Sequence, residues 1–196
     1  MKTVLVCNQK GGVGKTLIAN ELAFAFERDK VHYNFFDLDG QGSSIIQSHE
    51  DPEACVQVID TPGALQPELK SYIKDADFII VPTMLSRLDM KPLERMIEIL
   101  LPYKDKKPIL FVFNRWDRFN ATKDFITWFN KKYPDLKTTI LCDSTAFKKA
   151  CNYGVSIHEC DASHIGCKQI DYIYNSVKYE LNIKDEHTAL TEGRTA

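Results

Sequence analysis

The residues with the clearest chemical signature run from Gln9 to Thr16, in the order Gln-Lys-Gly-Gly-Val-Gly-Lys-Thr. Glycines leave backbone N–H groups free to wrap an anion, a lysine reaches its oxygens, and a hydroxyl can bind Mg²⁺, so this combination predicts a phosphate-binding loop. The usual pattern is G-x-x-x-x-G-K-[ST]. Here Gln9 takes the place of the leading glycine, and a second lysine, Lys10, follows it. The sequence therefore predicts a polyphosphate site of a deviant kind.

The flanking residues place this loop between a strand and a helix. Residues 3–7 form a short, β-branched apolar run typical of a buried parallel strand, and residues 17–28 are rich in alanine and leucine, as expected of a helix. The N–H groups and the dipole at a helix N-terminus favour an anion. The residues expected to contact the nucleotide are Lys10, Gly11, Gly12, Val13, Gly14, Lys15, Thr16 and Leu17.

Apolar runs and helix-like stretches alternate along the chain. The expected strands cover residues 3–7, 32–36, 56–59, 78–81, 109–113 and 138–141, and the expected helices cover 17–28, 65–76, 92–101, 121–132, 145–152 and 165–181. Such alternation indicates parallel strands joined by right-handed crossovers. We expect a doubly wound α/β domain, with a mostly parallel sheet and helices on both faces. It would span residues 1–181, followed by a polar, disordered tail at 182–196.

Composition narrows the setting of the protein. A net charge of −2 argues against a polycation that coats nucleic acid indiscriminately, so any DNA binding must come from a local patch. The N-terminus lacks a signal-peptide pattern, no apolar stretch approaches the length of a membrane span, and six scattered cysteines fit reduced thiols. These features favour a cytoplasmic protein.

One group of soft ligands requires a choice between two interpretations. His158, Cys160, His164 and Cys167 have the spacing H-x-C-x3-H-x2-C, which could hold zinc. Neither the familiar C-x2-C pair nor the H-x3-5-H pair is present. We favour a loop and helix start with incidental His and Cys residues, and keep a metal site as the alternative.

Polar residues follow several expected strands, where ligands of such folds bind. Asp37 and Asp39 follow the second strand, Asp60 the third, and Asn114 and Arg115 the fifth. Carboxylates beside a triphosphate require a cation to offset their charge, so Mg²⁺ is implied. We expect Thr16 to bind it directly and Asp60 through water, with Asp37 as a further candidate ligand, although strand-end aspartates can instead cap helices. Asp39 would then position the attacking water.

At this point the sequence resembles a known family. It is similar to the ParA/MinD family of deviant Walker A ATPases, and closest to the small ParA-type plasmid partition proteins. Three motifs carry the resemblance: Lys10-Gly-Gly-Val-Gly-Lys-Thr16, Asp37-x-Asp39-x-Gln41 and Asp60-Thr-Pro62. Further matches are Ile-Val-Pro-Thr at 80–83, Leu88-Asp89, Phe-Asn-Arg at 113–115 and Ala146-Phe147-x-x-Ala150-x-x-x-Gly154. The resemblance covers about residues 1–180.

The resemblance implies an ATP-dependent switch. Two protomers would sandwich two ATP molecules, with Lys10 reaching the partner's phosphates while Lys15 serves its own nucleotide. Asn114 would face the adenine, and Arg115 beside it is a further expected nucleotide contact. The ATP dimer would bind DNA non-specifically and be released when a centromere-binding, ParB-like adaptor stimulates hydrolysis. Candidate DNA contacts are Lys148, Lys149, Lys168 and Lys178, although a helical lysine is usually only solvated. Such a protein would associate with the nucleoid.

The sequence also departs from the family pattern. Family loops usually end in two hydroxyl residues, but Leu17 follows Thr16, which removes a possible bond to the α-phosphate. The interval between Asp39 and Asp60 is shorter than in most ParA-like chains, which puts contacts of that segment in doubt. The tail from residue 183 mixes charges and has few bulky apolar residues, so we expect no MinD-like membrane anchor. No cysteine pair matches an iron–sulfur relative.

Two other functions remain open, beside a third, small-molecule ligation or kinase chemistry on a similar fold, for which the sequence has no recognisable substrate-binding motif. Asp60-Thr-Pro-Gly63 fits the D-x-x-G phosphate sensor of GTPases, and Asn114-Arg-Trp-Asp117 is similar to their N-K-x-D guanine reader. Against a GTPase stand Arg115 in place of lysine and Gln9 in place of glycine, and Lys10 would have no role. The second alternative is a scaffold that binds nucleotide without turning it over.

Overall fold

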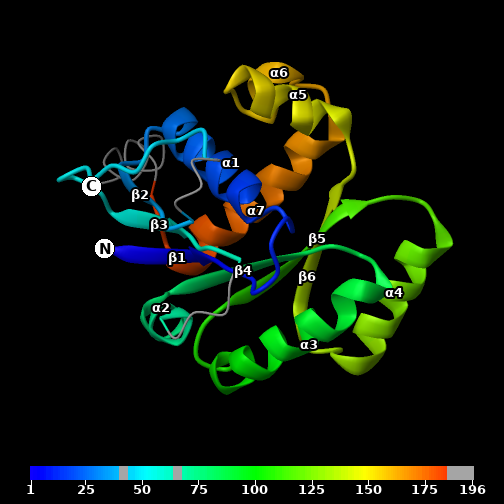
Figure 1. Ribbon diagram of the computed structural model, residues 1–196. Helices are drawn as coiled ribbons and strands as arrows, with labels where there is room; N and C mark the ends of the chain where they lie inside the picture. Colours follow the sequence, from blue (N-terminus) through cyan, green and yellow to red (C-terminus); the bar gives the residue numbers. More distant parts are fainter. Residues whose placement is uncertain (40–43, 64–67, 185–196) are drawn as a thin grey trace, which may run out of the picture.

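The computed structural model describes residues 1–39, 44–63 and 68–184. Six parallel strands form one sheet in the order β2-β3-β1-β4-β5-β6. Their bounds are β1 Lys2–Val6, β2 Tyr33–Asp37, β3 Val56–Asp60, β4 Phe78–Thr83, β5 Ile109–Trp116 and β6 Lys137–Cys142. Because β1 lies inside the sheet, the loop that follows it opens at the middle of the carboxyl edge (Figure 1).

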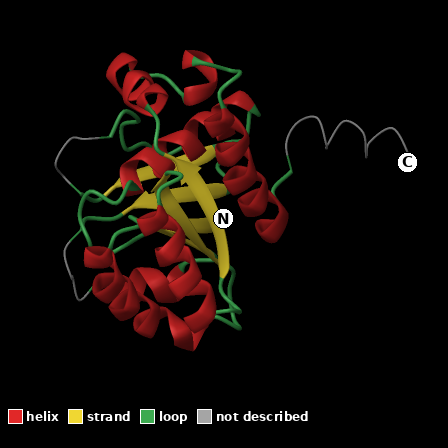
Figure 2. Ribbon diagram, turned by 90° about the vertical axis from the view of Figure 1, so that its right-hand side faces the viewer, coloured by secondary structure: helices red, strands yellow, loops and turns green. Residues whose placement is uncertain are grey.

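Helices cover both faces of this sheet (Figures 1 and 2). Helices α1, α5, α6 and α7 lie on one face, and α2, α3 and α4 lie on the other. Their bounds are α1 Lys15–Arg28, α2 Leu69–Asp75, α3 Arg87–Leu100, α4 Asn120–Lys132, α5 Thr145–Tyr153, α6 Ile157–Cys160 and α7 Ile165–Leu181, with a short 3-10 turn, η1 Leu101–Tyr103. The predicted doubly wound α/β fold is confirmed.

The central strand shows why the two layers form. Successive side chains of a strand point to opposite faces. Accordingly, Val4 and Val6 join the core beneath α1 and α7, whereas Leu5 and Cys7 join the core against α2, α3 and α4. A strand buried on both faces reads as a continuous apolar run, which is what the sequence at this position shows.

The third helix begins earlier than predicted. The sequence predicted a helix over residues 92–101, but α3 begins at Arg87 and contains Pro92. Ser86 and Asp89 form a capping box, in which each side chain bonds the backbone N–H of the other. This cap fixes the start of α3 and outweighs the single backbone hydrogen bond that proline removes.

Other differences are small or lie outside the described residues. Helix α6 was not predicted; it is a single turn capped by Ser156, whose hydroxyl accepts from the Glu159 N–H. Strand β5 continues to Trp116 through an irregularity after Phe113. Gln41, the start of the helix expected at residues 65–76 and residues 185–196 of the expected tail lie outside the described residues. In the described part, no helix combines the length and apolar character needed to cross a bilayer.

Two adjacent polar residues of α1 hold distant segments. Asn20 is buried, and its Oδ1 accepts hydrogen bonds from the Ser44 hydroxyl at 2.8 Å and the Ile46 N–H at 3.0 Å. Glu21 is also buried, and its Oε1 accepts from the Ile157 N–H at 2.9 Å. Helix α1 therefore anchors both the segment that follows β2 and the connection between α5 and α6.

Glu21 is expected to make folding depend on pH. Burial raises the pKa of its carboxyl from 4.5 to about 7, and the Glu159 charge adds to the shift. As pH rises the unfolded chain loses this proton first, so Glu21 should lower the free energy of unfolding by about 3 kcal/mol between pH 4.5 and 7. Glu21→Gln should therefore be more stable than the unchanged protein at pH 8 and lose that advantage at pH 5.

Urea denaturation at both pH values measures this difference. Glu50→Gln is the control, because Glu50 is exposed and its substitution should leave stability unchanged at both pH values. A Glu21→Gln effect of the same size at pH 5 and pH 8 would show that the buried charge is not its cause.

Candidate nucleotide-binding site

The loop from Gly11 to Gly14 has a backbone that requires glycine. Gly12 and Gly14 have φ values of 72° and 98°, in the left-handed region. A Cβ on Gly14 would lie 2.2 Å from Nδ2 of Asn114, and that Nδ2 donates a hydrogen bond to the Val13 carbonyl at 2.9 Å. The close approach of Asn114 fixes the loop, and it leaves no room for a side chain at residue 14.

A second loop rests directly against the first. Gly63 ends the Asp-Thr-Pro-Gly segment after β3, and a Cβ there would lie 2.8 Å from Cα of Gly11 and 2.9 Å from its nitrogen. The Thr61 hydroxyl also donates to the Val6 carbonyl at 3.0 Å. The two loops therefore meet backbone to backbone at the carboxyl edge of the sheet.

Lys15 lies at the first turn of α1 and is 5% exposed. Its Nζ donates to the Lys10 carbonyl at 3.3 Å. Burial lowers the pKa of Lys15, and the negative charges of Asp60 and Asp39 partly oppose that shift. A buried ammonium whose one acceptor among the described residues is a carbonyl is well placed to bind phosphate oxygens.

Three predicted metal-site residues come together beneath the loop. The Thr16 hydroxyl donates a hydrogen bond to Asp60 Oδ2 at 2.7 Å. Asp37 on β2 lies directly opposite Asp60 on the neighbouring strand β3. Burial is the main cause that raises the pKa of Asp60 to about 6, and the Asp37 charge adds to it. Asp60 is fully buried, and its Oδ1 has no hydrogen-bond partner within the described residues. This oxygen-rich donor set fits a hard divalent cation such as Mg²⁺.

Asp39 lies beside this group. Its N–H donates to Asp37 Oδ1 at 2.9 Å, and its charge acts on both Lys15 and Asp60. Asp37 Oδ1 therefore holds the backbone of Asp39 and does not cap a helix in the described structure. The structure brings the predicted Asp37, Asp39 and Asp60 to one edge with the phosphate loop.

The signature lysine has a partner within its own chain. Lys10 Nζ forms an ion pair with Asp89 Oδ1, and Asp89 is buried in the first turn of α3. The other oxygen, Oδ2, accepts from both the N–H and the hydroxyl of Ser86. The Lys10 side chain is 35% exposed, so its ammonium lies at the surface of the site. Sequence reasoning gave Asp89 no role, although Ser86 and Asp89 have capping-box spacing.

A cavity of about 410 Å³ adjoins the loop on the side of α5. It is large enough for a nucleoside, and we call it the nucleoside cavity. The predicted residues Gly12, Gly14, Leu17, Asn114 and Arg115 line one side. The lining also includes Cys142, Asp143, Ser144 and Phe147, to which sequence analysis gave no binding role, and Lys148, which it gave as a candidate DNA contact. Only the N-cap position of Ser144 could have indicated that it lies at this edge.

Asp117 is placed differently from a guanine reader. Its Oδ1 accepts from the Thr122 hydroxyl at 2.6 Å and from the Phe119 N–H at 3.0 Å, at the start of α4. It is not among the residues that line the cavity. A guanine reader needs its carboxylate free to face the base, so this arrangement counts against the GTPase interpretation.

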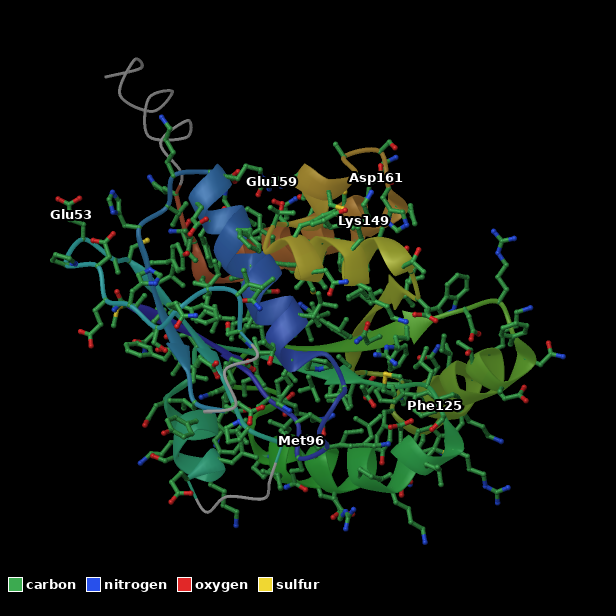
Figure 3. All side chains as sticks on the ribbon, turned by 45° about the horizontal axis from the view of Figure 1, so that its top comes forward. Glu53, Met96, Phe125, Lys149, Glu159 and Asp161 are labelled. Carbon is green, nitrogen blue, oxygen red and sulfur yellow. The ribbon has the colours of Figure 1, made fainter. Side chains whose placement is uncertain are left out.

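The four candidate DNA-contacting lysines have different surroundings. Lys148 lines the nucleoside cavity, and Lys149, labelled in Figure 3, has its Nζ 5.9 Å from the centre of the Tyr153 ring. Lys168 is exposed. Lys178 has a side chain only 16% exposed and pairs with Asp29 at 3.3 Å. Lys178 is therefore a poor candidate, because its charge is engaged within the chain.

The His and Cys group has partners of its own. His158 Nε2 lies 3.1 Å from Asp171 Oδ1, and the Cys167 thiol donates to the Asp161 carbonyl at 3.2 Å. His164 Nε2 lies 3.0 Å from the Ser144 hydroxyl. Across the described residues, no group of three or more His, Cys, Asp or Glu side chains is arranged to hold a metal ion.

Comparisons with known proteins bear on the fold and the family. An ATP complex of a McdA variant from Cyanothece has the same fold, with a TM-score of 0.75 and 17% identity over 94% of this chain and 98% of that one. MinD with Mg-ADP from Pyrococcus horikoshii OT3 has a TM-score of 0.68 and 13% identity over 90% of this chain and 95% of that one. A protein described as a plasmid partition protein from Borrelia burgdorferi B31, with AMPPNP, has a TM-score of 0.65 and 14% identity over 89% of this chain and 98% of that one. No curated protein sequence matches the chain. The family of CobQ/CobB/MinD/ParA nucleotide-binding domains matches residues 4–157, and the chain therefore belongs to that family.

Proposed function

We propose that this protein is a ParA-like ATPase that forms an ATP-sandwich dimer to segregate or position DNA. The observation that carries the proposal is the pair of lysines in one loop, Lys15 buried at the start of α1 and Lys10 at the surface of the site. The three structures that share the fold are complexes with ATP, Mg-ADP and AMPPNP, which supports ATP and Mg²⁺ as ligands here.

Each part of the site then has a role. Lys15 and the N–H groups of the loop hold the phosphates, and the base lies in the cavity beside Leu17 and Asn114. Thr16 and Asp60 would hold Mg²⁺, directly and through water respectively, and Asp37 adds negative charge beside them. When bound, the cation offsets the charge of the carboxylates and the phosphates.

Lys10 supplies the link between dimerisation and hydrolysis. Within a single chain its ammonium pairs with the carboxylate of Asp89. A triphosphate from a second protomer carries more negative charge than one aspartate and can compete for the same ammonium. A cation donated in trans to a reacting phosphate can accelerate its transfer by about 10³- to 10⁵-fold. Hydrolysis would therefore be slow until the dimer forms.

The remaining partners are proposed from the family. The ATP dimer would bind non-specific DNA on the nucleoid, and a ParB-like adaptor would stimulate hydrolysis and release it. Lys148 lines the nucleoside cavity and Lys178 forms an ion pair with Asp29, so Lys149 and Lys168 are the better candidates for contacts with DNA. Contacts with phosphates would be sensitive to salt.

Asp39→Ala tests the enzymatic part of the proposal. We expect ATP hydrolysis to fall at least 100-fold, because Asp39 positions the attacking water, while nucleotide binding and dimer formation persist. Phosphate release measured with ATP and with GTP, in the presence of DNA, gives the rate and the preferred base. Asp117→Asn should leave the preference for ATP unchanged, because Asp117 lies outside the cavity.

Two outcomes would contradict the assignment. Loss of Mg²⁺-dependent ATP binding in Asp39→Ala would show that Asp39, rather than Asp60, serves the metal. Absence of hydrolysis by the unchanged protein, even with DNA and its adaptor, would instead support a nucleotide-binding scaffold.

A further inference from the structure

The wall of the nucleoside cavity formed by β6 and α5 contains a hydroxyl with an unusual set of partners. Ser144 follows β6, lines the cavity and is the N-cap of α5, where its Oγ accepts from the Ala146 N–H at 3.1 Å. Oγ also lies 3.0 Å from Nε2 of His164, twenty residues further along the chain. Which of these two atoms donates decides what Ser144 can do in the cavity.

The other ring nitrogen of His164 settles the question. His164 is the N-cap of α7, and its Nδ1 accepts a hydrogen bond from the Gly166 N–H at 3.0 Å. A ring nitrogen that accepts carries no proton. In the neutral imidazole the proton therefore lies on Nε2, and His164 donates to Ser144.

The surroundings hold the His164 ring in this orientation. The Phe147 ring meets it edge to face, with centroids 6.2 Å apart. A Cβ on Gly166 would lie 2.7 Å from Phe147 Cζ and 2.9 Å from His164 Nδ1, so only glycine lets its N–H approach the ring. The tautomer is thus a consequence of the packing at the start of α7.

Ser144 is left with one unused hydrogen. Its oxygen has two lone pairs, and the Ala146 N–H and His164 Nε2–H occupy both. The hydroxyl hydrogen must then point elsewhere, and the described residues provide no acceptor for it. The residue lines the cavity, so the cavity is where an acceptor can come from.

We propose that Ser144 donates this hydrogen bond to a ring nitrogen of the bound purine and that His164 is the positioning residue that aims it. The proposal rests on the function proposed above, since it needs the base in this cavity. Adenine offers unprotonated ring nitrogens at positions 1, 3 and 7 as acceptors. His164 does not activate Ser144 as a nucleophile, because it donates to the hydroxyl and cannot take its proton.

Affinities for ATP and its 1-deaza, 3-deaza and 7-deaza analogues test this assignment. In each analogue a C–H group replaces one ring nitrogen. Ser144→Ala should weaken ATP binding about 3- to 10-fold, the value of one hydrogen bond. The same substitution should not weaken binding of the one analogue that lacks the accepting nitrogen. It should weaken binding of the other two analogues as much as it weakens binding of ATP.

Two matched variants separate the hydrogen bond from the helix cap. Ser144→Thr keeps both the cap and the donor and should bind like the unchanged protein. Ser144→Asp keeps an oxygen that caps α5 but loses the donor at neutral pH, so it should retain thermal stability and show the loss for ATP. His164→Asn keeps an oxygen for the Gly166 N–H but no longer donates to Ser144. It should reproduce part of the Ser144→Ala loss, with the same dependence on the analogue.

The outcomes are distinguishable. If the unchanged protein binds no ATP, the proposed function fails. If it binds ATP but Ser144→Ala weakens all four nucleotides by one factor, or none of them, the hydrogen bond to the base is refuted. If His164→Asn matches the unchanged protein for every nucleotide while Ser144→Ala does not, the positioning role of His164 is refuted.

Discussion

Replacing Lys15 with alanine is expected to abolish nucleotide binding. Its ammonium is buried beneath the phosphate loop, and within the described residues its one hydrogen-bond acceptor is the Lys10 carbonyl at 3.3 Å. Hydrogen bonds to charged groups contribute about 1.5 to 3 kcal/mol each, so losing two or more should reduce affinity at least 100-fold. Titration with a fluorescent ATP analogue measures the loss.

Lys106→Ala is the matched control for this experiment. Lys106 is exposed and precedes β5, whose N-terminal end lies at the opposite edge of the sheet from the phosphate loop. Its loss should leave affinity unchanged. Retained binding by Lys15→Ala within a few-fold of the unchanged protein would mean that the loop does not hold the phosphates as proposed.

Replacing Lys10 with alanine should separate binding from dimerisation. We expect affinity for ATP to change by no more than a few-fold, because Lys15 and the loop serve the nucleotide of the same chain, while the ATP-dependent dimer is lost. Analytical ultracentrifugation with Mg-ATP and with Mg-ADP measures the dimer. The same experiment with non-specific DNA at two salt concentrations tests whether the dimer is the form that binds DNA.

Asp89→Asn provides the comparison for Lys10→Ala. It removes the ion-pair partner of Lys10 but keeps the lysine, and the amide oxygen can still accept from Ser86. It should therefore form the ATP dimer at least as readily as the unchanged protein. A stable Mg-ATP dimer of Lys10→Ala would contradict the role of Lys10 in trans.

Local patterns made the fold predictable. The apolar run after Lys2 could be read as a strand buried on both faces, and the glycines and Lys15 marked the turn into α1. The positions of Asp37, Asp39 and Asp60 followed from a general rule, because the carboxyl ends of parallel strands share an edge. The order of the strands, which distant contacts decide, needed the structure, as did the short helix α6.

The missed features depend on contacts between distant parts of the chain. Nothing near Gly63 in sequence reveals that it touches Gly11, and nothing near Ser144 reveals His164. The early start of α3 did have a local signal, the capping-box spacing of Ser86 and Asp89, which the prediction of a helix from residue 92 did not use. The pairing of Lys10 with Asp89 joins residues 79 positions apart.

The neighbouring anchors on α1 have a consequence for rebuilding this protein. Asn20 holds residues 44 and 46, beyond the Asp37–Asp39 segment, and Glu21 holds residue 157, beyond the α5 wall of the nucleoside cavity. A chimera that imports either segment from a relative must therefore import the matching residue of α1 as well. Because the two anchors are consecutive, the segment that follows Asp39 and the segment that follows α5 are not independent modules for transplantation.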